Sequence, residues 1–300
     1  MFDYRYHALS LAAVLLALAV GVVIGVAIGD SNLVSSAKSG IVHDLSSEVN
    51  AAQRQTGQLR IQLTGEEAFA NDLYPIAVHG LLSGRSIGLV FLGGASDRVD
   101  GLVRNAITQA GGDLATVVAV REPLDLAGLA RAAVGTHYAA LGTEQSKAGE
   151  QLVERFGALI GRQLVSGGQA IGRELVSRAR GPLLSAFDGQ LGKLEGMVIV
   201  RAEPAGMIPE QAHAAAAFES GLIDGVTAVG DPAVGVELSS TEPSQVPWYQ
   251  GQDIASVDDL DATAGQAALI YALTGSRGSY GSKPTANSLL PNVVGSSTRP

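Results

Sequence analysis

The pattern of apolar and polar positions divides the chain into an unbroken apolar run, a heptad repeat and a longer mixed segment. The apolar run, LSLAAVLLALAVGVVIGVAIG, covers residues 9–29 and holds no charged residue and no proline. As a helix, its 20 residues from Leu9 to Ile28 would rise about 30 Å, the thickness of the hydrocarbon core of a bilayer. We therefore predict a retained transmembrane helix at 9–29, preceded by a short stub at 1–8.

A cleaved signal peptide is the alternative for the same run, because Ala27-Ile28-Gly29 has the small-x-small form of a cleavage site. The apolar core is longer than such peptides usually carry, which favours a retained helix. Arg5 and His7 precede the run, whereas Asp30 follows it and no basic residue occurs again before Lys38. By the positive-inside rule, we predict a single-pass protein of the plasma membrane with a cytoplasmic N-terminus and an extracytoplasmic domain.

Small residues occupy every fourth position of the apolar run, and therefore one face of the predicted helix. They are Ala13, Ala17, Gly21, Gly25 and Gly29. Glycine has no side chain, so two helices can approach closely along such a face and gain dispersion contacts that lipid does not match. We predict helix dimerisation through Gly21, Gly25 and Gly29; ordinary use of small residues in a membrane helix is the alternative.

A heptad pattern follows between residues 38 and 74. Its apolar positions are spaced alternately by three and four residues, and polar residues fill the positions between them. This seam consists of Val42, Leu45, Val49, Ala52, Leu59 and Leu63, with Thr56 at the remaining position. We predict a coiled-coil stalk at 38–74 in a homodimer, ended by Pro75. A single amphipathic helix folded back on its own domain is the alternative.

In residues 84–275, short apolar runs alternate with amphipathic segments. A run at 86–92 is followed by Gly93-Gly94, a helix pattern at 97–110 and a second apolar run at 114–120. Buried strands that alternate with helices are typical of a parallel sheet covered on both faces. We predict the α/β fold class here: a Rossmann-like parallel-sheet domain with a helical insertion.

The same alternation continues to the end of this domain. The further predicted elements are a helical insertion at 147–165 that continues at 171–177, a strand at 197–201, a helix at 210–220 closed by Gly221, a strand at either 226–229 or 233–238, and a last helix at 263–274 capped by Asp261. From Ser276 the chain is rich in Gly, Ser, Pro and Thr, so we predict a flexible tail at 276–300.

Composition and charge restrict the classes of partner. The net charge is −9, which argues against nucleic acid as a partner and against a polybasic contact with anionic lipid. The sequence contains no cysteine, and this excludes disulfides, thiolate metal sites and cysteine nucleophiles together. Aromatic residues make up only 5% of the chain, which suits a tightly packed α/β domain better than a β-sandwich.

The loop Gly93-Gly94-Ala95-Ser96-Asp97 is one candidate for chemistry, because it joins a predicted strand to a predicted helix. The N-terminus of a helix can hold a phosphate group. The loop lacks the third glycine of a dinucleotide fingerprint and the lysine of a P-loop. The residues therefore favour an ordinary turn with Asp97 as the N-cap, and a nucleotide-using enzyme is the alternative.

Three carboxylates, Asp258, Asp259 and Asp261, lie just before the last predicted helix. Oxygen ligands in such a cluster suit a hard cation or the arginine of a partner, so these three are the candidate metal ligands of the sequence. The alternative is an N-cap with acidic residues that the helix dipole favours.

The other candidate groups indicate no reaction. Trp248 and Tyr249 lie in a loop bounded by prolines, where they form either a recognition surface or a plug of the core. The five histidines are scattered without metal-ligand spacing, and no nucleophile–base motif is present. We predict that the protein is not an enzyme, and the residues identify no cofactor.

Several stretches, taken in chain order, carry a resemblance to a known family. They are HALSLAAVLLALAVGVVIG, the predicted stalk, SIGLVFLGG, FESGLIDGV, VPWYQ, ASVDDLDATAGQAALIYAL and the late YGSK with the LLP that follows it. This order resembles the actinobacterial MctB-like copper transporter family, and the first and the SVDDLDATAGQAAL stretches are the most specific parts. The resemblance implies a cell-envelope protein linked to copper efflux and homeostasis, with copper as the only metal implied.

Two functions therefore remain open. The first is a membrane-anchored envelope protein that serves copper homeostasis without catalysis, within a larger assembly. The second is a coiled-coil scaffold that recruits an envelope partner, since a related member of the family resembles a partner in a cell-separation complex acting on peptidoglycan hydrolases. Cu(I) prefers thiolate and thioether ligands, and the only methionines are Met1, Met197 and Met207. Copper is thus implied by the resemblance and not by the residues.

Overall fold

The computed structural model describes residues 4–29, 31–143, 147–167, 170–190, 192–202 and 206–292. The chain divides into two compact units, which we call the N-terminal unit (Met1–Glu66) and the α/β unit (Glu67–Pro300). The prediction of an α/β domain is confirmed.

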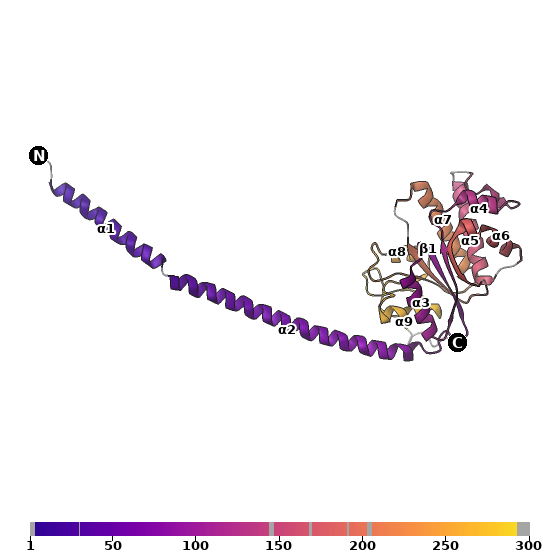
Figure 1. Cartoon of the computed structure of the whole chain (residues 1–300), viewed down its shortest axis with the longest axis horizontal. Helices are drawn as coiled ribbons and strands as arrows, with labels where there is room; N and C mark the ends of the chain where they lie inside the picture. Colours follow the sequence, from indigo (N-terminus) through magenta and orange to yellow (C-terminus); the bar gives the residue numbers. More distant parts are fainter. Residues whose placement is uncertain are drawn as a thin grey trace. The chain divides into compact units, whose positions relative to one another are not determined.

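The N-terminal unit contains helix α1, Tyr4–Ile28, and most of helix α2, Ser31–Val78 (Figure 1). A window of α1 from Arg5 to Ala27 is long and apolar enough to cross a membrane, and none of it is buried. The predicted apolar helix is therefore present, although Gly29 follows its last helical residue. Gly21 and Gly25 have open space beside them, with no atom within 4 Å of an added Cβ.

Helix α2 exposes the apolar seam that the heptad pattern predicts. The exposed fractions are 60% for Leu45, 47% for Val49, 57% for Leu59 and 58% for Leu63. Ala52 is exposed as well, and the side chain of Val42 lies outside the described residues. These positions lack a partner within the described part of the chain, and the coiled coil stays a prediction.

Pro75 lies inside α2 and does not end it, so that part of the prediction is wrong. The last turns belong to the α/β unit, where Tyr74 and Val78 are buried. The Tyr271 hydroxyl also donates a hydrogen bond of 3.0 Å to the carbonyl of Ala77. These tertiary contacts hold the turn beyond the proline in a helical conformation.

The α/β unit is built on one seven-stranded sheet with the order β3-β2-β1-β4-β5-β6-β7. The strands are β1 Ser86–Gly93, β2 Asp113–Val120, β3 Leu184–Gly189, β4 Met197–Ala202, β5 Ala233–Val236, β6 Ala255–Val257 and β7 Ser279–Tyr280. All neighbouring pairs are parallel except β2 and β3, which are antiparallel. In the centre, Val90 of β1 is paired with Val118 of β2 and with Ile199 of β4.

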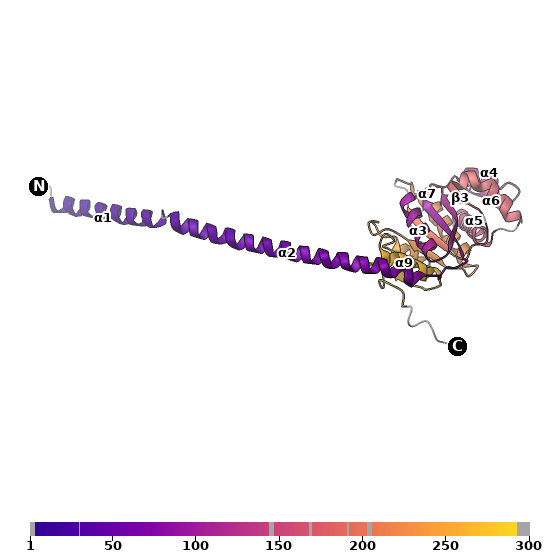
Figure 2. The ribbon, with the colours of Figure 1, turned by 60° about the horizontal axis from the view of Figure 1, so that its bottom comes forward.

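Helices cover both faces of this sheet, as Figures 1 and 2 show. Helices α3 (Asp97–Gln109) and α9 (Thr263–Leu273) pack on one face together with the end of α2. The other face is covered by α4 (Leu126–Ala132), α5 (Lys147–Ser166), α6 (Ala170–Leu183) and α7 (Pro209–Thr227), with the short η1 (His137–Ala140) and α8 (Val246–Gly251). Alternate residues of β1 enter the two cores: Val90 and Leu92 one, Leu89 and Phe91 the other.

Helices α5 and α7 pack with their backbones in close contact. An added Cβ at Gly157 or Gly161 of α5 would collide with the carbonyl oxygen of Phe218 or Leu222. An added Cβ at Gly221 or Gly225 of α7 would collide in turn with Glu154 or Ala158. The sequence predicted that Gly221 closes this helix, and that prediction is wrong, because Gly221 lies within α7. Glycine is needed at this position because a side chain would prevent the close approach of α5.

Two other boundaries differ from the sequence prediction. Residues 226 and 227 belong to α7, so the strand is the second of the two alternatives, β5 at 233–236. The helical insertion runs on through Pro182 to Leu183, after which β3 forms the antiparallel edge of the sheet.

The segment predicted as a flexible tail belongs to the α/β unit as far as residue 292. β7 pairs with β6, and Ser279 and Tyr280 are buried. The Asn287 and Ser288 backbone N–H groups donate to the carbonyl of Ser279. The prediction is wrong for 276–292, because polar, glycine-rich composition does not reveal these pairings; residues 293–300 lie outside the described residues.

Candidate functional site

The chain order of the sheet places a crevice between the carboxyl ends of β1 and β4. Connections from these two neighbouring strands lead to opposite edges of the sheet, and ligands of open α/β sheets bind at such a switch point. A cavity of about 510 Å³ lies there. Its lining includes Gly94, Ser96, Arg201, Glu237, Thr241 and Gln245.

Arg201, at the end of β4, is the centre of a buried polar network beside this cavity. Its Nε lies 3.0 Å from Oε2 of Glu219, a side chain of α7 that is only 1% exposed. Its Nη1 donates a hydrogen bond of 2.7 Å to Oε1 of Gln245. The guanidinium also lies 4.8 Å from the ring centroid of Trp248. A buried ion pair with these additional contacts fixes the geometry of the crevice wall.

The neighbouring residue Tyr249 is fully buried, and its hydroxyl accepts a hydrogen bond of 3.0 Å from the Arg201 backbone N–H. Burial raises the pKa of this hydroxyl far above its ordinary value. The sequence left open whether Trp248 and Tyr249 form a recognition surface or fill the core, and Tyr249 is a core residue. Trp248 is half-buried against Arg201.

A second buried ion pair joins the C-terminal segment to the loop after β5. Nζ of Lys283 lies 2.6 Å from Oε1 of Glu237 and donates to the carbonyls of Leu238 and Thr241. Ser244 donates a further hydrogen bond to the Glu237 carboxylate. Reasoning from the residues missed Lys283, because it lies in the predicted tail; the YGSK stretch of the family resemblance was the one signal that pointed to it.

The three candidate metal ligands have different surroundings. The Asp258 carboxylate is buried and accepts hydrogen bonds from the backbone N–H groups of Ser282 and Lys283. An added Cβ at Gly281 would collide with this carboxylate, so glycine is required there.

Asp261 does not cap α9. Ala262 holds the N-cap position without a side-chain hydrogen bond, whereas Asp261 accepts two hydrogen bonds from Ser239 and pairs with Arg98 at 3.3 Å. Burial opposes the charged form, but the hydrogen bonds from Ser239 and the guanidinium of Arg98 hold the pKa of Asp261 below its ordinary value.

Asp259 is 1% exposed and lies under the first turn of α9. Within the described part of the chain, its Oδ1 has no hydrogen-bond partner. Burial, and then the neighbouring Asp258 carboxylate, raise the pKa of Asp259 to about 6. Across the described ranges, no group of three or more His, Asp or Glu residues is arranged to hold a metal ion.

The Gly93-Gly94 loop is a close strand-to-helix turn. Gly93 has a positive φ of 101°, and an added Cβ would collide with the carbonyl oxygen of Ala202 on the neighbouring strand. Ser96, and not Asp97, is the N-cap of α3, because its Oγ accepts a hydrogen bond from the Val99 N–H. Asp97 is instead the first residue of the helix, where the helix dipole stabilises its negative charge.

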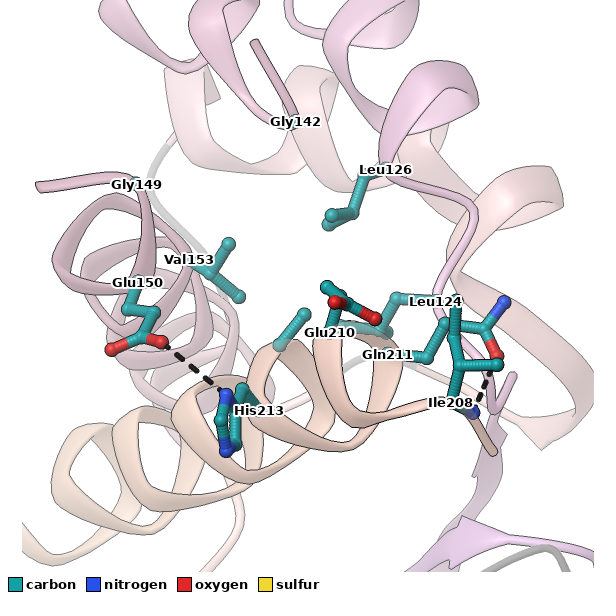
Figure 3. Close-up of a pocket in the computed structure, with 11 residues that line it drawn as sticks. Leu124, Leu126, Gly142, Gly149, Glu150, Val153, Ile208, Glu210, Gln211 and His213 are labelled. Atoms are coloured by element: carbon teal, nitrogen blue, oxygen red, sulfur yellow. Dashed lines mark hydrogen bonds and ion pairs between the residues drawn. The ribbon is translucent and has the colours of Figure 1, made fainter. Parts of the chain in front are cut away.

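A second cavity, of about 320 Å³, lies on the helical face formed by α5 and α7 (Figure 3). Leu124 and Leu126, which follow β2, form one wall, and Val153 of α5 and Ala214 of α7 form another. Figure 3 shows the Glu210 carboxylate pointing into the space between these walls. At the mouth, Oε1 of Glu150 lies 3.7 Å from Nδ1 of His213.

The two units together define a class of protein: an α/β domain of Rossmann-like strand order whose chain carries an apolar, membrane-type helix. A family model with the description "Copper transport outer membrane protein, MctB" matches residues 1–291, and the chain belongs to this family. The resemblance inferred from the sequence is thus confirmed.

Three named relatives align with this chain over nearly its whole length. Proteins called "Copper transporter MctB" from Mycobacterium bovis and from two strains of Mycobacterium tuberculosis are each 27% identical to this chain over 295 residues. The alignment covers 91% of this chain and 92% of each relative. The family description and helix α1 together support membrane anchoring.

Proposed function

We propose that this chain serves copper efflux or copper homeostasis as a non-catalytic, single-pass membrane protein within a larger assembly. The observation that carries the proposal is the extent of the family match, which includes both the apolar helix and the α/β unit. A membrane helix satisfies its own backbone groups but cannot by itself enclose a pathway. Since α1 is the one such helix among the described residues, a route for copper would need spans from other chains.

The residues support an indirect role in copper handling. The sequence has no cysteine and three methionines, whereas Cu(I) prefers sulfur ligands. Of these methionines, Met197 is 1% exposed in β4, close to Gly88 of β1. A protein that organises or recruits other components fits this chemistry better than one that carries the ion.

The test is a deletion strain, compared with the same strain complemented by the full chain. We expect the deletion to raise cellular copper and to lower the copper concentration that stops growth, with both values restored by complementation. Unchanged copper content and unchanged sensitivity would refute the copper function.

We further propose that the N-terminus is cytoplasmic and the α/β unit extracytoplasmic, at the plasma membrane. The support is Arg5 before the apolar run and Asp30 after it. Because the chain has no cysteine, Asp188→Cys would supply a single thiol at a side chain that is 82% exposed. A membrane-impermeant maleimide should label this thiol in intact cells; labelling only after lysis would reverse the orientation.

A second candidate function is a scaffold that recruits envelope partners in cell separation and in the control of peptidoglycan hydrolases. The exposed seam on α2 favours it, because apolar residues at a and d positions are typical of helices that pair. Pull-down of the full chain in a native detergent should capture a hydrolase or its regulator under this function. Capture of copper-export components alone would favour the first.

A further inference from the structure

The cavity between α5 and α7 combines apolar walls with an unpaired carboxylate. Val153 and Ala214 are buried at 4% and 9% exposure, and Leu124 and Leu126 pack against the same core. Glu210 is exposed, and in the part of the chain that the structure describes neither a side chain nor a backbone group pairs with its carboxylate. Among the described residues that line the cavity, Glu150 and Glu210 carry carboxylates, and none is a lysine or an arginine.

These features are complementary to a cation on an aliphatic stem. The stem of a lysine or arginine side chain can lie along apolar walls while its charged end meets a carboxylate. A charge-assisted hydrogen bond to Glu210 would be stronger than one between neutral groups. A neutral ligand would gain no charge interaction with the exposed Glu210 carboxylate, and an anionic ligand would meet two like charges.

The size of the cavity favours one side chain over a larger molecule. Its volume of about 320 Å³ is at the lower end of the roughly 300–1,000 Å³ that drug-sized ligands occupy. Glu150 and His213, at the mouth, have side chains that are 50% and 70% exposed. A residue presented from the surface of another protein could therefore enter without rearrangement of the core.

We propose that this cavity is a docking site for an arginine or lysine side chain of a protein partner, with Glu210 as the residue that recognises its charge. The inference rests on the proposed role of the chain as a component that binds other envelope proteins, and it states the chemistry of that contact. Glu150 contributes a second carboxylate at the mouth, and Val153 and Ala214 contact the aliphatic stem.

The experiment uses the purified full chain in detergent, with N-acetyl-arginine amide as the probe and N-acetyl-citrulline amide as its neutral isostere. Ligand-detected NMR titration should show arginine binding about tenfold more tightly than citrulline, because only arginine provides the charge. Equal binding of the two probes, or binding of neither, would overturn the proposal without any variant being needed.

Variants then locate the binding. Glu210→Gln should remove the preference for arginine, and Glu174→Gln, at an exposed glutamate of α6 outside the cavity, should retain it. Thermal unfolding of each variant shows whether its fold is intact. An unchanged preference in folded Glu210→Gln would place the binding elsewhere and refute the assignment.

Failure of this inference and failure of the proposed function are distinguishable. The probe titration contains no copper and needs no other protein, so it does not depend on the phenotype of the deletion strain. A chain that prefers arginine at Glu210 while the deletion leaves copper unchanged would keep the docking site and lose the copper function. The reverse outcome would keep the function and lose the site.

Discussion

Glycines at four-residue spacing occur in two regions of this chain with opposite surroundings. In the α/β unit, Gly157 and Gly161 of α5 face Gly221 and Gly225 of α7, and a Cβ at any of the four would collide with backbone atoms. In α1, a Cβ at Gly21 or Gly25 would meet no atom within 4 Å. The same spacing is thus used for packing in one region and left without a contact in the other.

The difference teaches how a small-residue repeat should be interpreted. In α5 and α7 the partner is supplied by the same chain, so the repeat stabilises the fold. In α1 and along the seam of α2, no partner is present among the described residues, so we expect association with a second chain. Substitutions in the first region should therefore change folding, and substitutions in the second should change association alone.

The largest expected effect is that of Gly161→Leu in α5. Its side chain would meet the Leu222 carbonyl and the Val226 backbone nitrogen of α7, which cannot move without separating the two helices. We expect a loss of about 3 kcal/mol or more in the free energy of unfolding, measured by denaturant titration. Gly101→Leu is the control, because Gly101 of α3 has open space beside it. Similar effects of the two would contradict the contact between α5 and α7.

Lys283→Met tests whether the C-terminal segment belongs to the α/β unit in energetic terms. The substitution would leave the Glu237 carboxylate, whose side chain is 2% exposed, without its ion-pair partner. We expect a destabilisation of about 3 kcal/mol, because breaking one side of a buried pair leaves an uncompensated charge. Arg277→Met, at a side chain that is 87% exposed, should have almost no effect in the same unfolding measurement. An unchanged free energy of unfolding in Lys283→Met would show that the ion pair does not stabilise the α/β unit, as expected of a flexible tail.

The pH dependence of the free energy of unfolding should show the raised pKa of Asp259. Its pKa is raised from an ordinary 3.8 to about 6, so the folded state binds the proton more tightly than the unfolded state. Stability from this group is therefore complete below about pH 4, falls as the pH rises towards 6, and stays low above that. We expect Asp259→Asn to stabilise the protein by about 2 kcal/mol at pH 7 and to have little effect at pH 4.

Asp261→Asn should give the opposite result and serves as the control. The pKa of Asp261 is lowered, so its charged form stabilises the folded state above its ordinary pKa, and that contribution is lost as the pH falls through the folded-state value. The substitution should therefore destabilise the protein at pH 7 and have less effect in acid. Unfolding free energies measured from pH 4 to 7.5 check both, and parallel profiles would contradict the assigned environments.

The smallest effect is expected for Gly21→Leu, Gly25→Leu and Gly29→Leu together in the N-terminal unit. They should weaken the dimer in detergent or lipid about tenfold and leave the unfolding of the α/β unit unchanged. Val23→Leu, on another face of α1, should leave the dimer intact. Crosslinking across a dilution series with lipid or detergent gives the dimer fraction, and an unchanged fraction in the glycine variant would exclude this face as the contact.

Prediction from the sequence succeeded where one local pattern sufficed. The apolar run of α1 predicted a helix long and apolar enough to cross a membrane, and the runs that became β1, β2 and β4 predicted buried strands, each from its own residues. The candidate site was predicted less well. Asp258, Asp259 and Asp261 lie within four residues of one another, but their contacts are set by distant parts of the chain. Asp258 accepts hydrogen bonds from residues 282–283, and Asp261 is paired with Ser239 and Arg98. Oδ1 of Asp259 has no hydrogen-bond partner among the described residues.

The sequence by itself therefore determined the membrane-type helix, the α/β class and the family. Hydrophobic periodicity and the order of motifs are properties of neighbouring residues, and they need no knowledge of distant contacts. Only the tertiary structure decided that α2 continues past Pro75, that α7 continues through Gly221, and that Lys283 is paired with Glu237. Each of these depends on a partner far away in sequence, whose backbone or charge changes the balance of energies that local propensity alone would set.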